Sequence, residues 1–265
     1  MPGQRQPAAP RVGLFVTCLV DLFRPTIGFA AHKLLEGAGC VVEVPVAQTC
    51  CGRSAYSSGD REEARAMAQN TIEAFEGFDH VVTPSGACAG MLAIHYPALF
   101  EGDAEWQARA TTLASKVHEL TSFLVDVQGM RAVQARLAAS VTYHDACAGL
   151  NDLGVRAQPR ALLESVEGVR LTEMRDPTSC CGFGGCAGAH PALAASRATR
   201  KTADIEAAGA DMLLAGDLGC LMDMAGRLRR QGSQVEVRHI AEVLAGMVDG
   251  PPIGARHANR QQQHS

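Results

Sequence analysis

The sequence predicts an α/β protein of two pseudo-repeated halves, each with a parallel sheet and cysteine-bearing loops at the carboxyl ends of its strands. Two observations predict this fold class. Short apolar runs alternate along the chain with longer amphipathic stretches, which is typical of parallel α/β folds. A pattern of four cysteines also occurs twice, and its two copies keep nearly the same spacing.

The apolar runs are short enough to be buried strands, and the amphipathic stretches between them have the length and period of helices. The strands are expected at residues 12–17, 41–44, 80–83, 141–144, 169–173, 212–215 and 235–239. The helices are expected at residues 27–36, 61–75, 107–127, 159–165, 191–208 and 218–230.

We expect the first cysteine-rich repeat at residues 12–128 and the second at 139–248, with the boundary in or around a helix that links them. Residues 1–11 contain three prolines and no hydrophobic pattern, and residues 249–265 begin with Asp-Gly-Pro-Pro and contain three glutamines at 261–263. Both segments are predicted to be flexible tails.

Composition excludes several classes of protein. Of the 265 residues, 47% are hydrophobic and 20% charged, which excludes a disordered or collagen-like chain. The net charge is −4 and the basic residues are scattered, which argues against nucleic-acid binding. The apolar run at 12–20 is far shorter than the ~20 residues of a membrane span and follows no charged leader. We therefore expect a soluble, cytoplasmic protein.

Ten cysteines are the exception to this ordinary composition, and in a reducing compartment so many thiols indicate metal or redox chemistry. Three landmarks of the first half (a single cysteine, a Cys-Cys-Gly and another single cysteine) recur 129, 130 and 132 residues later. The eight candidate metal ligands are Cys18, Cys50, Cys51, Cys88, Cys147, Cys180, Cys181 and Cys220.

Each landmark follows a predicted strand and precedes a predicted helix, so the cysteines of one half should meet at the carboxyl edge of its sheet. Helix amino-termini at that edge favour thiolates, the form of cysteine that binds metals. Four glycines near the cysteine pairs are expected to let the backbone approach a bulky inorganic centre. They are Gly52, Gly182, Gly184 and Gly185.

The adjacent cysteines favour an iron–sulfur cluster over zinc. Neighbouring side chains of an extended segment point to opposite sides, which suits several irons better than one tetrahedral ion. Zinc sites usually space their cysteines by two to four residues. Zinc remains the alternative, and a purely structural set of thiols is the weaker one, since buried cysteines need no repeated spacing.

The doubled pattern resembles the CCG cysteine-rich domain, which occurs in the heterodisulfide reductases and in iron–sulfur subunits of glycolate and lactate oxidation. The chain from residue 12 to about 247 is most similar to the lactate utilisation protein A family. The stretches that carry the resemblance are Thr17-Cys18, Thr49-Cys50-Cys51-Gly52, Pro84-Ser85-Gly86-Ala87-Cys88, Tyr143-His144-Asp145-Ala146-Cys147, Cys180-Cys181-Gly182-Phe183-Gly184-Gly185 and Gly219-Cys220-Leu221-Met222. The resemblance implies iron–sulfur clusters and oxidation of L-lactate to pyruvate together with a partner iron–sulfur protein and a small companion subunit.

The chain departs from the fuller motif of heterodisulfide reductase, which ends in Cys-x-x-Cys. Here Ser85 and Asp217 stand at the earlier of these two positions, and Ala148 stands where family members often have histidine. The type of cluster therefore stays open between an ordinary four-iron cluster and the unusual cluster of that enzyme. Ser85 and Asp217 are expected to cap the helices that follow, with an oxygen ligand from Asp217 as the alternative.

Other candidates are weaker. Residues 182–187 match the dinucleotide fingerprint G-x-G-x-x-A, but close approach to a cluster explains these glycines better. Cys186 could be an extra ligand or a redox-active thiol, whereas Cys40 is expected to be a buried hydrophobe. His144 and Asp145 could act as a general acid–base pair or as hydrogen-bond partners of a cluster.

Taken together, these patterns predict an electron-transferring iron–sulfur subunit of an L-lactate-oxidising complex, with one cluster in each repeat. The alternatives are a related subunit of a glycolate- or disulfide-linked oxidoreductase, and a zinc-stabilised scaffold without redox activity. His95 and His239 lie in apolar surroundings and are expected to be structural.

Overall fold

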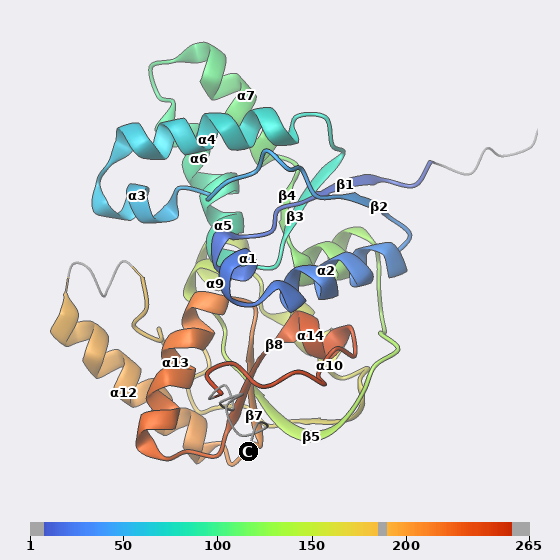
Figure 1. Cartoon of the computed structure of the whole chain (residues 1–265), viewed down its shortest axis with the longest axis vertical. Helices are drawn as coiled ribbons and strands as arrows, with labels where there is room; N and C mark the ends of the chain where they lie inside the picture. The colour runs from blue at the N-terminus through green and yellow to red at the C-terminus, as the bar shows by residue number, and fades with distance from the viewer. Residues whose placement is uncertain (1–7, 185–189, 256–265) are drawn as a thin grey trace, which may run out of the picture.

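Two four-stranded parallel sheets with the same strand order form the frame of the molecule (Figure 1). The structure is a computed structural model that describes residues 8–184 and 190–255. In order across the first sheet lie β2 (Val41–Glu43), β1 (Arg11–Leu14), β3 (His80–Thr83) and β4 (Val117–Glu119). In order across the second sheet lie β6 (Glu167–Leu171), β5 (Arg136–Tyr143), β7 (Met212–Ala215) and β8 (Glu236–His239). The predicted fold class, two repeated α/β halves, is confirmed.

Helices connect the strands. In the first half they are α1 (Cys18–Phe23), α2 (Pro25–Gly37), α3 (Arg53–Ser58), α4 (Arg61–Phe75), α5 (Gly86–Gly90), η1 (Met91–His95), α6 (Tyr96–Leu99), α7 (Ala104–Ala114), α8 (Leu120–Ser122) and η2 (Phe123–Val127). In the second half the described helices are α9 (Cys147–Leu153), α10 (Ala157–Leu163), α12 (Pro191–Ala207), α13 (Leu218–Gln231) and α14 (Ile240–Leu244).

Helix α4 illustrates why these segments fold as they do. The Asp60 side chain accepts a hydrogen bond from the Glu63 amide and so caps the amino-terminus. Ala64, Ala68 and Ile72 recur at helical spacing and are buried against the first sheet, while the opposite face of the helix is charged. The helix has the bounds that its periodicity predicts.

One predicted helix, 107–127, is wrong. The structure ends α7 at residue 114 and then forms β4, which pairs in parallel with β3. The strand is only three residues long and contains polar His118 and Glu119, so it gives no apolar run in the sequence. Pairing with β3, which only the folded chain supplies, outweighs the local helical pattern.

The ends of the two repeats also differ from expectation. Residues 128–135 are not helical, and β5 begins at Arg136. Residues 249–255, expected in a flexible tail, lie against the body of the protein. The Ile253 amide donates to the Val237 carbonyl at 2.8 Å, and the Arg24 guanidinium donates to the Pro251 carbonyl at 2.6 Å.

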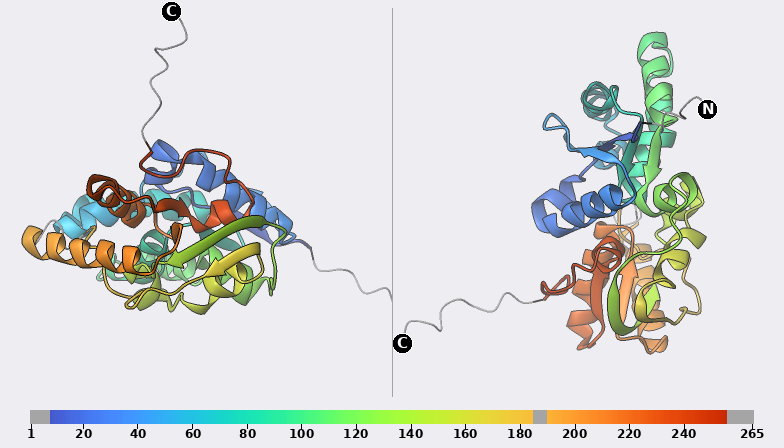
Figure 2. Two further views of the ribbon diagram at one scale, coloured as in Figure 1. Left: turned by 90° about the horizontal axis from the view of Figure 1, so that it is seen from below. Right: turned by 90° about the vertical axis from the view of Figure 1, so that its right-hand side faces the viewer.

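The two halves share a hydrophobic core, so they are not separate bodies. Side chains from the inner faces of both sheets, such as Val12, Val82, Val141 and Leu214, belong to one buried cluster. Between the sheets, α2 of the first half packs on α14 of the second, and α10 of the second packs on α8 and η2 of the first. Figure 2 shows the halves stacked about this shared layer. The outer face of each sheet has its own core under other helices.

Glu119 lies at the carboxyl end of β4 and points into the contact between the halves. It is 3% exposed, and a side chain added at Gly216 of the second half would meet its carboxylate and the Tyr143 hydroxyl at 3.5 Å. The other carboxylate oxygen accepts hydrogen bonds from the Thr121 and Ser122 amides and caps α8. Burial raises the pKa of Glu119 to about 7 despite these bonds.

We predict that the unfolding free energy of Glu119→Gln falls less than that of the wild type as the pH rises. The folded protein holds this proton over a range where the unfolded chain has released it, so stability falls as pH rises from about 4.5 through 7. The difference amounts to up to about 3 kcal/mol of unfolding free energy. Urea unfolding of both proteins at pH 5 and pH 8 measures it, and an unchanged slope between these pH values contradicts the assignment.

Candidate metal centres

Four cysteines of the first half come from three loops at the carboxyl edge of the first sheet. Cys18 is the first residue of α1, which the Thr17 hydroxyl caps, and Cys88 lies in the first turn of α5. Cys50 and Cys51 lie in the loop that follows β2. Because parallel strands end at the same edge, residues 70 positions apart in the sequence meet there.

The four sulfurs form two close pairs of different exposure. The Sγ atoms of Cys18 and Cys50 lie 3.6 Å apart and are partly exposed. Those of Cys51 and Cys88 lie 3.3 Å apart and are buried. The set therefore has an inner side, anchored in the protein, and an outer side that faces the surface.

The second half repeats this arrangement. Cys147 begins α9, Cys220 lies in the first turn of α13, and Cys180 and Cys181 lie in the loop after β6. Cys147 and Cys180 are partly exposed, whereas Cys181 and Cys220 are buried. The structure thus brings all eight predicted ligands into two sets of four.

Crowding of the thiols perturbs their ionisation. Burial and the neighbouring sulfur of Cys180 raise the pKa of Cys147 to about 11. A hydrogen bond with Cys181, together with burial, raises the pKa of Cys180 to about 12. Such thiols give up their protons when a metal cation offsets the charge, so metal binding releases protons. The described cysteines are all free thiols, and this soft donor set fits a thiolate-bound metal or cluster.

The sulfur spacings of the two sets can be compared with those around a single metal ion. A tetrahedral zinc with Zn–S bonds of about 2.3 Å holds its four sulfurs ~3.8 Å from one another. Within the described part of the chain, the group of three or more ligand atoms that all lie within 4.8 Å of one another is His144, Cys181 and Cys220. The close Sγ pairs of the first half, at 3.6 and 3.3 Å, are near the spacing around a single ion.

Ser85 and Asp217 cap helices, as the sequence suggests, and they also bind each other across the two halves. The Ser85 hydroxyl accepts from the Cys88 amide, and one Asp217 oxygen accepts from the Gly219 and Cys220 amides. The other Asp217 oxygen accepts from the Ser85 hydroxyl at 2.9 Å and from the Ala87 amide at 3.3 Å. Both Asp217 oxygens therefore take part in capping, and ligation by Asp217 stays an untested alternative.

His144 and Asp145 do not form an acid–base pair. Both Asp145 oxygens accept from the Arg160 guanidinium, at 2.8 and 2.9 Å, and the Asp145 side chain is 0% exposed. The ring nitrogens of His144 have no hydrogen-bond partner among the described residues. The side chains of His144 and Asp145 therefore point into different surroundings, as expected for successive residues of an extended segment.

Backbone geometry requires glycine at positions near the cysteine pairs. Gly52, Gly182 and Gly184 have φ angles of 78°, 93° and 83°, a region that disfavours other residues. A Cβ at Gly182 would collide with the Ala194 carbonyl of α12, and one at Gly52 would meet Ala64 of α4. These two glycines thus permit close packing of helices, and their approach to an inorganic centre stays a prediction. Gly185 and Cys186 lie outside the described residues.

The remaining candidates are structural. Cys40 is 7% exposed and belongs to the shared core. His239 caps α14 by accepting from the Ala241 amide at 3.1 Å, and its other ring nitrogen lies 3.0 Å from the Pro84 carbonyl of the first half. His95 lies against Tyr56, with ring centroids 4.8 Å apart.

Comparison with known proteins assigns the family. Residues 12–93 and 141–225 match the cysteine-rich domain called CCG. Lactate utilization protein A of Geobacillus sp. (strain WCH70) is 46% identical over 235 residues, which are 88% of this chain and 98% of that protein. The protein of the same name from Macrococcus caseolyticus is 45% identical over 240 residues, 90% of this chain and 98% of its own length. This chain belongs to the CCG cysteine-rich domain family and to the lactate utilization protein A family.

The fold also occurs at low sequence identity. A crystal structure of a hypothetical protein from Helicobacter pylori superposes with a TM-score of 0.64 at 9% identity, covering 93% of this chain. The chain spans about half of that protein, 52% of its length, and the likeness concerns the fold alone. In the described parts of this lactate utilization protein A relative, no helix combines the length and apolar character required to cross a membrane.

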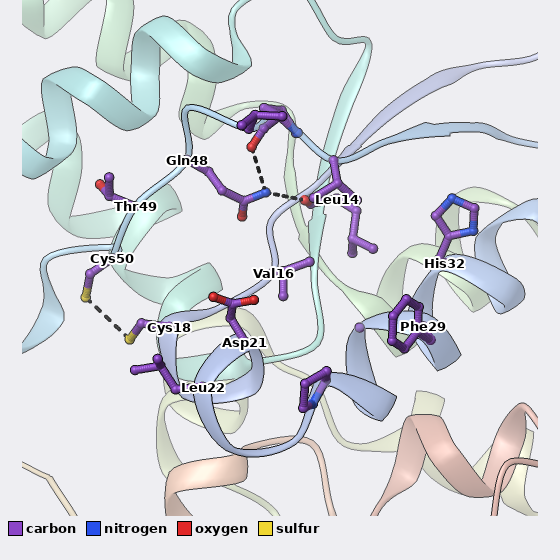
Figure 3. A pocket seen from close by; sticks show the side chains of 15 residues that line it. Leu14, Val16, Cys18, Asp21, Leu22, Phe29, His32, Gln48, Thr49 and Cys50 are labelled. Carbon is purple, nitrogen blue, oxygen red and sulfur yellow. Dashed lines mark hydrogen bonds between the residues drawn. The ribbon is translucent and has the colours of Figure 1, made fainter.

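A groove of about 630 Å³ opens beside the outer cysteines of the first set (Figure 3). Its walls come from the end of β1, from α1 and α2, and from the loop before Cys50. Leu22, Phe29 and Val46 on its rim are highly exposed, at 72%, 66% and 101%. No pattern in the sequence predicts this groove, since apolar residues at helical or strand spacing predict core, and only the fold leaves these uncovered.

We predict that Arg160→Met destabilises the folded protein by about 3–5 kcal/mol, because it leaves the buried Asp145 carboxylate unpaired. The double variant Asp145→Asn with Arg160→Met should recover much of this loss, since it removes the orphaned charge. Chemical unfolding measures both. An Arg160→Met protein of wild-type stability would contradict the structural role of Asp145.

Proposed function

We propose that this chain is an iron–sulfur subunit that carries electrons in a complex oxidising L-lactate to pyruvate. The observation that carries the proposal is the doubled set of four cysteines, each with a buried and a partly exposed pair, in a chain of the lactate utilization protein A family. The name of the relatives supports lactate as the substrate of the complex. The two cysteine sets support the electron-carrying role of this chain.

Each set of four cysteines would hold one cluster: Cys18, Cys50, Cys51 and Cys88 in the first half, and Cys147, Cys180, Cys181 and Cys220 in the second. A bound iron–sulfur cluster supplies a site that accepts and releases electrons, at a potential set by exposure and by hydrogen bonds to its sulfurs. The buried pairs anchor this site in the protein. The exposed pairs keep an edge of it near the surface, where electrons can be exchanged with another protein.

The chain is expected to need partners for the chemistry at carbon. Removal of two electrons and the α-hydrogen from a 2-hydroxy acid normally requires a hydride acceptor or a comparable cofactor. The groove beside the first set has no lysine or arginine among its lining residues to bind a carboxylate, and Asp21 on its wall would repel one. A partner iron–sulfur protein and a small companion subunit would supply the substrate site.

A second candidate is zinc in the second half. The compact group of His144, Cys181 and Cys220 favours it, because three ligand atoms within 4.8 Å of one another could surround a single ion. The described residues of the first half contain no comparable group. Metal analysis distinguishes the two candidates.

We predict that anaerobically purified protein is brown and contains acid-labile sulfide roughly equal to its iron. Cys51→Ser and Cys181→Ser should each remove about half of the iron, because each breaks one of two independent sites. Cys40→Ser is the matched control and should leave the iron unchanged, since Cys40 lies in the shared core. Stoichiometric zinc without sulfide would refute the iron–sulfur assignment.

The isolated chain, loaded with clusters, should not oxidise L-lactate with an artificial electron acceptor. Activity should emerge when the candidate partner proteins are added, and pyruvate formation measures it. Glycolate in place of L-lactate tests the related oxidoreductase. Sustained pyruvate formation by the isolated chain, abolished by His144→Ala, would make this chain the catalytic subunit and contradict the electron-carrier role.

A further inference from the structure

His144 is a buried polar side chain without a partner in the described protein. It follows β5, and its amide donates to the Leu214 carbonyl at 2.9 Å, which fixes the backbone. The side chain is 0% exposed, and neither ring nitrogen has a hydrogen-bond partner among residues 8–184 and 190–255. Buried ring nitrogens normally have partners, and among the described residues none meets hydrogen-bond geometry, although the Pro177 carbonyl lies near the ring.

The ring faces the buried pair of the second cysteine set. Its ligand atom and the Sγ atoms of Cys181 and Cys220 all lie within 4.8 Å of one another. An imidazole carries at least one N–H donor in either protonation state.

The equivalent position of the first half holds an apolar ring. Phe15 precedes Cys18 by three residues, as His144 precedes Cys147, and Phe15 is also fully buried. Its ring packs against Phe75, with centroids 5.6 Å apart. The two cysteine sets share their ligands, exposure and strand order, but among the described residues only the second has an imidazole grouped with its buried sulfurs.

We propose that the His144 N–H donates a hydrogen bond to a cysteine sulfur of the second cluster, and that this cluster is therefore reduced more easily than the first. The inference rests on the proposed function. Four cysteines already supply thiolates, which leaves the ring as a donor. A donor toward a ligating sulfur stabilises the extra negative charge of the reduced state.

The consequence is that electrons would pass from the first cluster to the second. In this step the first cluster is oxidised and the second is reduced by one electron, and no covalent bond forms or breaks and no proton is transferred. The first site lies beside the exposed groove and would exchange electrons with a partner. His144 is thus a positioning and tuning residue that acts through the cysteines.

The test is a redox titration of the full chain, followed by electron paramagnetic resonance, in wild type and in His144→Phe. The variant copies the first half and should lower the potential of the second cluster while leaving the first unchanged. We expect an about tenfold shift in its ratio of reduced to oxidised form, the size of one hydrogen bond to a charged acceptor. For a one-electron couple this is about 59 mV.

Two further variants keep the test decisive. His144→Gln keeps an N–H donor and should restore part of the potential, which also covers the case in which the phenylalanine variant fails to fold. His80→Phe is the matched control, because His80 pairs with His118 at 3.2 Å in the first sheet, and both potentials should stay unchanged.

Several outcomes overturn the inference. If wild type holds two clusters and His144→Phe leaves both potentials unchanged, the hydrogen bond has no effect, while the proposed function stands. Strong coupling of a directly bound nitrogen to the iron spins would make His144 a ligand instead of a donor. Zinc in the second half, or protein without any cluster, would refute the inference together with the proposed function.

Discussion

The carboxylate of Asp217 joins the two halves at the point on which both candidate centres depend. One oxygen caps α13 and so places Cys220, while the other binds the amino-terminus of α5, which places Cys88. The close approach of Gly86 to Gly149 supports the same contact, because a Cβ at Gly86 would lie 2.7 Å from the Gly149 Cα. A side chain there would separate the helices that carry the two sets. The geometry of one centre is therefore tied to that of the other through a few polar and backbone contacts.

Within this nearly symmetric frame, equivalent positions hold different side chains, and the differences are chemical. Serine caps α5 where aspartate caps α13, and glutamate ends β4 where histidine ends β8. Phe15 and His144 differ in the same way beside the buried cysteines. A repeated fold can thus keep two similar ligand sets and give them unequal surroundings, which would matter for a protein that passes single electrons between two sites.

Access to the centres is set by the outer cysteine pairs and by what lies over them. The first pair borders an apolar groove with exposed rim residues, a feature that marks interaction sites in soluble proteins. The described residues that line the groove include no lysine or arginine. The proposed subunit, which would exchange electrons and leave substrate binding to others, would account for both properties.

Cysteine spacing and hydrophobic period are local properties of the chain, so they predict the repeat, the two cysteine sets and most of the strands and helices. The sequence also indicated that Ser85 and Asp217 cap helices, since capping depends on the next three residues. The remaining features depend on contacts between distant parts of the chain. The β4 strand exists because β3 offers it hydrogen bonds, the pairing of Asp145 with Arg160 separates it from His144, and the bond between Ser85 and Asp217 crosses 132 positions. Such contacts join residues that no local pattern relates, so they become visible only when the sheets bring their edges together.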